Sequence, residues 1–135
     1  MEMLYKKYTV RLLAVVTLMA LLVYIWMLAN AGKARGKFKI SAPSIEGPIE
    51  FQSVLRVQSN TVEQMVVFFP ALWMCAFYLG DTWAALGGLA WVIGRIIYAL
   101  GYYSAPGKRS LGFGITAFAS VALIVGTMVG LFLHW

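Results

Sequence analysis

Charged residues are scarce in this sequence of 135 amino acids: aspartate, glutamate, lysine and arginine make up only 12% of it. A soluble domain has about twice that share. The shortage excludes intrinsic disorder, which requires high charge and low hydrophobicity. A soluble globular domain is also unlike this sequence, because 61% of the residues are hydrophobic. The composition is that of a small membrane protein with several spans.

Cysteine and histidine, the usual zinc ligands, are almost missing as well. The sequence has one cysteine, Cys75, and one histidine, His134. A single cysteine cannot form a disulfide within the chain, and its apolar neighbours indicate a buried small side chain. Neither a Cys/His cluster for zinc nor a glycine-rich phosphate-binding loop is present, so we expect no metal site. We attribute the net charge of +6 to membrane orientation and not to nucleic-acid binding.

Four apolar segments are long enough to cross a bilayer, at residues 12–29, 62–79, 83–100 and 111–133. The first follows basic residues as a signal peptide does, but its length and the lack of a clear cleavage site predict a retained helix. Only a short turn that contains Gly80 and Asp81 separates the second and third segments, which predicts an antiparallel hairpin. The second helix is expected to start near Pro48, because proline is tolerated in a first turn. The sequence therefore predicts an all-α, four-helix transmembrane bundle in a single domain, 1–135.

Basic residues predict the orientation of this bundle. Four spans place both termini on one side, which carries Lys6, Lys7 and Arg11. The opposite side carries a long polar loop, expected over residues 30–50, and a short one near 104–110. Their lysines and arginines predict that this side is cytoplasmic: Lys33, Arg35, Lys37, Lys39, Lys108 and Arg109. The loop's basic residues can also be interpreted as a topology determinant resting on anionic lipid headgroups.

Polar side chains gather at the cytoplasmic end of the second helix. Arg56, Asn60 and Glu63 are spaced i, i+4 and i+7, which places them on one face. An ionisable residue within a membrane is costly and usually faces the bundle interior. One interpretation is a structural pair between Arg56 and Glu63, with Asn60 as a hydrogen-bond link between helices. The other is a binding site.

The third helix repeats the pattern with Arg95, Tyr98 and Tyr102, spaced i, i+3 and i+7. The tyrosines alone would also suit an aromatic belt at the membrane surface. Arg109 follows at the entrance of the fourth helix on the same side. Because arginine binds carboxylates with two hydrogen bonds and glutamate suits an ammonium, the cluster predicts a small anionic ligand that carries an amine.

Two motifs resemble those of the MAPEG family, the membrane-associated proteins of eicosanoid and glutathione metabolism. Residues 51–63, FQSVLRVQSNTVE, resemble its R-x-Q-x-N-x-x-E signature. Residues 94–103, GRIIYALGYY, resemble its second motif, and Lys108 and Arg109 match the basic residues that follow it. The similarity covers nearly the whole chain and is strongest to the glutathione transferase and leukotriene C4 synthase branches.

The resemblance implies a homotrimer that binds glutathione at the cytosolic side, between neighbouring subunits. It implies a transferase that conjugates glutathione to lipophilic electrophiles and can reduce lipid hydroperoxides, in the inner membrane of a bacterium or the endoplasmic reticulum of a eukaryote. Arg109 would stabilise the glutathione thiolate, and Arg95 would help to hold the site. The remaining glutathione-binding residues would be Arg35, Arg56, Gln58, Asn60, Glu63, Tyr98 and Tyr102.

Other functions are compatible with the same four-helix architecture. Gln64 and Gly36 stand where the leukotriene C4 synthase branch has a tyrosine and an arginine, which argues against leukotriene synthesis in particular. The alternative is a non-catalytic lipid-binding or scaffold protein, similar to the five-lipoxygenase activating protein. The retained Arg109 favours the enzyme. A proton-coupled multidrug exporter would need an ionisable residue in its first helix, and residues 12–29 contain none.

Overall fold

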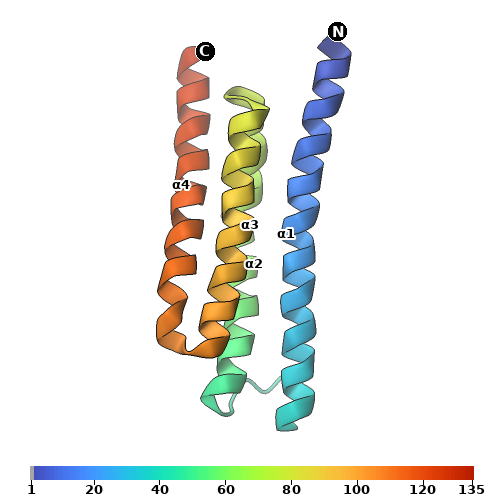
Figure 1. Ribbon diagram of the computed structural model, residues 1–135, viewed down its shortest axis with the longest axis vertical. Helices are drawn as coiled ribbons and strands as arrows, with labels where there is room; N and C mark the ends of the chain where they lie inside the picture. Colours follow the sequence, from blue (N-terminus) through green and yellow to red (C-terminus); the bar gives the residue numbers. More distant parts are fainter. Residues whose placement is uncertain (1) are drawn as a thin grey trace.

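The computed structural model describes the backbone of residues 2–135 and the side chains of residues 10–135. Four long helices alternate in direction within one bundle (Figure 1): α1 (Glu2–Phe38), α2 (Ile49–Tyr78), α3 (Asp81–Ser104) and α4 (Ser110–Leu133). A short 3₁₀ helix, η1 (Pro106–Arg109), joins α3 to α4. Both termini lie at one end of the bundle, and the α1–α2 and α3–α4 connections lie at the other.

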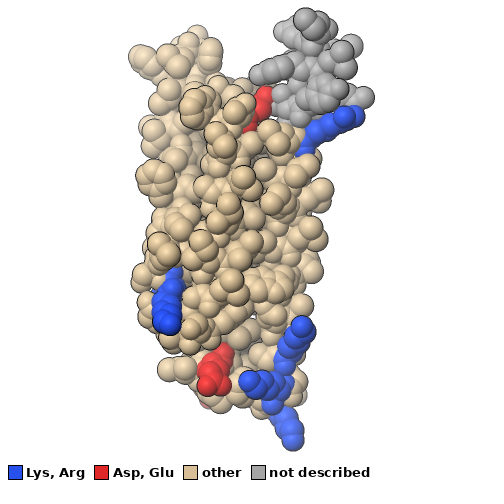
Figure 2. Space-filling model, viewed as in Figure 1, with Lys and Arg blue, Asp and Glu red and all other residues tan. Residues whose placement is uncertain are grey.

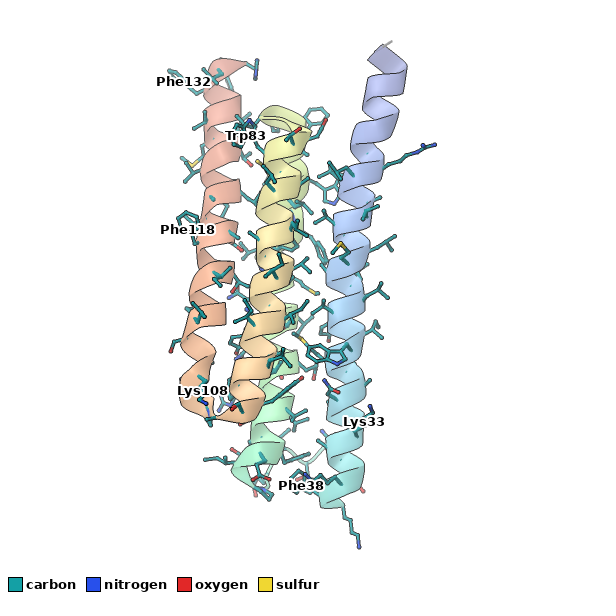
Figure 3. The ribbon with its side chains drawn as sticks, viewed as in Figure 1. Lys33, Phe38, Trp83, Lys108, Phe118 and Phe132 are labelled. Atoms are coloured by element: carbon teal, nitrogen blue, oxygen red, sulfur yellow. The ribbon has the colours of Figure 1, made fainter. Side chains whose placement is uncertain are left out.

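All four helices are long and apolar enough to cross a membrane. Their outer surface is hydrophobic: Phe118 and Phe132 point away from the bundle (Figure 3) and are 77% and 84% exposed. Figure 2 shows a broad uncharged band between the charged groups near the two ends. Because lipid offers no hydrogen bonds to the backbone, helices that satisfy their own backbone groups suit this environment. The predicted fold class, an all-α membrane bundle of four helices, is confirmed.

Helices α2 and α3 lie at the centre of the packing, because α1 and α4 each pack against both of them. The shared core is apolar. Its centre is formed by Phe68 of α2 and Trp91 of α3, whose rings stack with centroids 4.0 Å apart and planes 5° apart. Val16 of α1 and Leu123 of α4 close this core from either side. The arrangement leaves one groove between α2 and α4 and another between α1 and α3.

Glycines let α4 approach its neighbours closely, as small residues do between membrane helices. Gly112 of α4 lies directly against the backbone of Tyr98 on α3, with no room for a β-carbon. The Gly126 and Gly130 pair faces α2 instead, and a β-carbon on Gly126 would lie 3.0 Å from the Cys75 sulfur. The position of Tyr98 therefore depends on the absence of a side chain at Gly112.

The first connection is shorter than predicted, which corrects the expected loop over residues 30–50. Helix α1 continues through this region, so that the polar connection covers only residues 39–48. Alanine is the best helix former, and Ala31 and Ala34 are buried in one cluster with Phe51 of α2. Packing against α2 thus extends the helix beyond its apolar span.

The other helix ends are set by local residues. Helix α2 begins at Ile49, directly after Pro48. Gly80 turns the chain from α2 into α3 with φ 144°, a conformation that glycine adopts easily. Lys108 and Arg109 lie in η1, immediately before α4, and not in α4 itself. The side chains of Lys6 and Lys7, which the predicted orientation also uses, lie outside the described residues.

Candidate active site

A cavity of about 730 Å³ lies between α2 and α4, near the end of the bundle that holds both connections. Five of the predicted site residues line it: Arg56, Asn60, Tyr98, Tyr102 and Arg109. The other lining residues are Ile49, Gln52, Ser53, Pro106 and Phe113. Residues far apart in the sequence, from α2, α3, η1 and α4, therefore meet around one space.

Helical spacing explains this convergence. On α2, Ser53, Arg56 and Asn60 follow one another at intervals of three and four residues and so form one stripe. On α3, Tyr98 and Tyr102 are one turn apart and face the same cavity. The chain then reverses through η1, where Lys108 is labelled in Figure 3, and this reversal returns Arg109 to the cavity.

Tyr98 forms the buried wall of the cavity. Its hydroxyl oxygen accepts a hydrogen bond of 2.7 Å from the Asn60 side-chain amide, so Asn60 does link two helices. The Tyr98 and Tyr102 rings meet edge to face, with centroids 5.7 Å apart. These contacts hold both phenol rings in place at the cavity wall, and a phenol hydroxyl can both donate and accept a hydrogen bond.

Arg109 lies at the exposed rim of the cavity. The central carbon of its guanidinium group is 5.4 Å from the centroid of the Tyr102 ring, within the range of a cation–π contact. One of its terminal nitrogens lies 3.5 Å from the Pro106 carbonyl oxygen, at the limit of a hydrogen bond. Weak contacts of this kind orient the guanidinium group and leave donors available for an anion.

Arg95 does not line the cavity but lies behind Tyr98, fully buried. Its Nε donates to the Thr61 hydroxyl at 2.9 Å, and one terminal nitrogen donates to the Thr116 hydroxyl at 3.1 Å. The guanidinium carbon sits 3.9 Å from the centroid of the Tyr98 ring. A buried charge with these partners ties α2, α3 and α4 together, and we interpret Arg95 as the support on which Tyr98 rests.

Glu63 lies beside the main cavity. It lines a second cavity of about 320 Å³, which shares Gln52, Arg56 and Asn60 with the first. Among the described residues, Arg56 and Glu63 form no ion pair with each other, and both are exposed. The interpretation of these two residues as a structural pair is therefore wrong.

Arg35 and Gln58 face away from the cavity. The Gln58 amide donates to the Tyr24 hydroxyl on α1 at 2.9 Å. Arg35 donates to the Ser44 carbonyl oxygen at 2.8 Å and holds the connection after α1. Arg35 extends from α1 over the Phe51 ring of α2, and Gln58 extends from α2 toward α1. Within one subunit the structure does not bring them to the other site residues.

Two polar lining residues, Gln52 and Ser53, are not among the residues predicted from the sequence. They lie one turn before Arg56 on the same stripe, so extending the helical spacing backwards would have found them. Their side chains donate to nearby backbone, Gln52 to the Gly47 carbonyl at 3.1 Å and Ser53 to the Ile49 carbonyl at 2.8 Å. These bonds stabilise the start of α2, where the cavity opens.

The chemistry of the cavity is that of an anion site with hydrogen-bond donors. Two guanidinium groups, two side-chain amides, a serine hydroxyl and two phenols surround it. No group of three or more histidine, cysteine, aspartate or glutamate residues that could hold a metal occurs among the described side chains. The site can bind carboxylates and stabilise a further negative charge beside Arg109.

Comparison with known proteins places this arrangement in a family. The MAPEG family model matches residues 13–129. Microsomal glutathione S-transferase 2 of Mus musculus is 36% identical over 119 residues, covering 85% of this chain and 81% of that protein. Leukotriene C4 synthase of Mus musculus is 33% identical over 126 residues, covering 93% and 84%. The uncharacterized protein sll1147 of Synechocystis sp. is 42% identical over 118 residues, covering 87% and 86%.

The family match spans all four membrane helices and every residue that lines the cavity. The resemblance of the two sequence motifs is thereby confirmed. The family model, the four apolar helices and the similarity to a microsomal glutathione S-transferase agree: this chain belongs to the MAPEG family.

Proposed function

We propose that this protein is a membrane-bound glutathione transferase that conjugates glutathione to lipophilic electrophiles and also reduces lipid hydroperoxides. The observation that carries the proposal is the position of Arg109 at the rim of a polar cavity lined by Arg56, Tyr98 and Tyr102. Relatives named as a glutathione S-transferase and a leukotriene C4 synthase support the same class of reaction.

The cavity suits glutathione in size and charge. Its volume of about 730 Å³ lies within the range of small-molecule sites. Glutathione carries two carboxylates and one ammonium group. The guanidinium group of Arg56 would bind a carboxylate of glutathione. The ammonium group would lie in the adjoining cavity, beside the carboxylate of Glu63. Since Arg56 and Asn60 line both cavities, one ligand can extend across them.

Arg109 would act on the sulfur. Only the thiolate attacks an electrophile, and a thiol with an ordinary pKa of about 8.5 is only about 3% ionised at neutral pH. A positive charge beside the sulfur favours the thiolate. The sulfur then forms a bond to the electrophilic carbon, whose leaving group or π-electron pair takes the negative charge.

Phe113 would connect the cavity with the membrane. It lines the cavity from α4 and is 50% exposed on the outer surface of that helix. A lipophilic electrophile dissolved in the bilayer can therefore approach along α4 and meet glutathione at the rim. Holding both reactants in one place removes much of the entropic cost of their encounter.

A homotrimer completes the proposed site. Arg35 of α1 and Gln58 of α2 lie where these two helices meet, away from the cavity between α2 and α4. A neighbouring copy that packs this side against the cavity would bring both residues toward glutathione. We further propose that this end of the bundle faces the cytoplasm, because most of its exposed charges are basic.

A direct test is conjugation by the purified protein in lipid nanodiscs. Glutathione and a chromogenic aryl halide are supplied, and the thioether product is followed by absorbance; a lipid hydroperoxide is tested separately. We expect a rate that saturates with glutathione and exceeds the uncatalysed rate. Folded protein that binds a lipid but shows neither activity would instead support the non-catalytic lipid-binding function.

Glu63→Gln is expected to weaken glutathione binding about fivefold, because a neutral amide replaces the carboxylate that meets the ammonium group. Titration calorimetry measures the change. Glu50→Gln is the matched control, since Glu50 lies on the same helix but lines a different cavity. Unchanged affinity together with a lower melting temperature would assign Glu63 a structural role.

A further inference from the structure

A second groove runs between α1 and α3, on a different side of the bundle from the candidate active site. At the end that holds the connections it widens into a cavity of about 780 Å³, and farther along it holds an apolar cavity of about 320 Å³. Trp26 of α1 lines both cavities, so the two spaces adjoin. Neither cavity shares a lining residue with the cavity that holds Arg109.

The α1 wall of this groove is a single helical stripe that changes from apolar to cationic. Leu22, Trp26, Asn30, Lys33 and Lys37 follow at intervals of three or four residues. At about 100° per residue these positions fall within about 80° of one another around the helix. From Leu22 to Lys33 the stripe is about 16 Å long, comparable to a stretch of acyl chain.

The α3 wall changes in the same direction. Ile96 and Leu100 line the apolar cavity, and Tyr103 and Ser104 line the wider one. The Asn30 amide donates a hydrogen bond to the Tyr103 hydroxyl at 3.3 Å. The centroids of the Trp26 and Tyr103 rings lie 5.9 Å apart. Tryptophan and tyrosine with a polar edge suit the boundary between headgroups and hydrocarbon.

The wide end of the groove carries a net positive charge. Lys33 and Lys37 are exposed at its rim, and Glu50 of α2 is its one acidic lining residue. Figure 3 labels Lys33 on the lower part of α1, where Figure 2 shows basic groups gathered on the surface. Two ammonium groups against one carboxylate match a headgroup with one net negative charge.

We propose that this groove is a binding site for an anionic phospholipid. The phosphate lies between Lys33 and Lys37, and the glycerol region lies beside Trp26 and Tyr103. One acyl chain follows the apolar cavity toward Leu22 and Leu100. The proposal does not depend on glutathione chemistry, because the groove is separate from the candidate active site.

Native mass spectrometry of the delipidated full-length protein tests this site. The protein in detergent receives phosphatidylglycerol or phosphatidylcholine with identical acyl chains, and bound lipid is counted at each concentration. We expect phosphatidylglycerol to bind more tightly. The double variant Lys33→Gln/Lys37→Gln should lower its affinity by about 30-fold, because each lysine contributes to attraction for an anionic lipid.

The matched control is the double variant Lys39→Gln/Lys108→Gln, which removes the same charge at the same end of the bundle but outside the groove. It should keep the preference for phosphatidylglycerol. An equal loss in both double variants, or no preference in the unmodified protein, would overturn the proposal. A melting temperature confirms that each variant is folded.

Soluble glycerol phosphate distinguishes a lipid site from a simple phosphate site. Because it lacks acyl chains, it should not displace phosphatidylglycerol at equal concentration, and a short-chain phosphatidylglycerol should bind more weakly than a long-chain one. Displacement by glycerol phosphate at equal concentration would show that the apolar cavity contributes nothing, and would contradict assignment to a lipid.

Discussion

Arg109→Ala is expected to lower the turnover of glutathione conjugation by about 25-fold near neutral pH, with a much smaller change in glutathione affinity. The size follows from thiolate ionisation: lowering a thiol pKa from about 8.5 to about 6.5 raises the ionised fraction from about 3% to about 75%. That change corresponds to about 2.7 kcal/mol. A guanidinium group held near the Tyr102 ring, directly beside the sulfur, can supply it.

Steady-state kinetics and calorimetry separate the two roles that Arg109 can have. Lys108→Ala is the matched control, because Lys108 is the preceding exposed cation in η1 and does not line the cavity. It should leave turnover near that of the unmodified protein. If Arg109→Ala loses affinity and turnover equally, Arg109 is a binding residue and does not stabilise the thiolate.

Gly112→Ala is expected to destabilise the protein by about 1–3 kcal/mol and to disturb the active site at the same time. A β-carbon at this position would overlap the backbone of Tyr98, so α3 and α4 must move apart. Tyr98 would shift relative to Asn60 and lose the 2.7 Å hydrogen bond. We therefore expect a lower melting temperature together with weaker glutathione binding.

Gly114→Ala provides a control in the same helix. Gly114 is exposed and a β-carbon there meets no atom within 4 Å. In an open helical position alanine is more favourable than glycine by about 0.5–1 kcal/mol. Gly114→Ala should therefore raise the melting temperature slightly, and equal effects of the two substitutions would show that the close approach at Gly112 has no energetic role.

The membrane bundle was predictable because lipid imposes strict demands on the backbone. Each span must be helical and apolar over about 20 residues, and hydropathy alone detects such segments. The length of α1 beyond the membrane was not predictable in this way. Ala31 and Ala34 extend the helix because they pack against α2, and this contact exists only in the folded bundle.

The candidate site was predictable where it depends on helical spacing. Arg56 and Asn60 are one turn apart and line one cavity together, as do Tyr98 and Tyr102. Helical spacing shows which residues share a face, but it does not show which neighbouring helix packs against that face. Gln58 is an example: it lies only two residues from Asn60, but its side chain donates a hydrogen bond to Tyr24 on α1.

Arg95 shows the same limit more clearly. Its helical spacing on α3 places it on the same face as the two tyrosines. Its burial in the core, however, depends on hydrogen-bond partners from two other helices. Thr61 of α2 and Thr116 of α4 accept its hydrogen bonds in the core. Thr61 occupies an unspecified position of the first motif, and Thr116 lies outside both motifs. The supporting role of this buried arginine could therefore be described only from the structure.

The most direct test of this account is an ultraviolet difference titration of the detergent-purified protein with glutathione near neutral pH, which detects the thiolate by its absorbance. S-methylglutathione, which has no ionisable thiol, is the control ligand. We predict a saturable thiolate band with glutathione, none with S-methylglutathione, and a strongly reduced band in Arg109→Ala. Folded protein that binds glutathione without producing the band would contradict the claim that this cavity ionises its thiol.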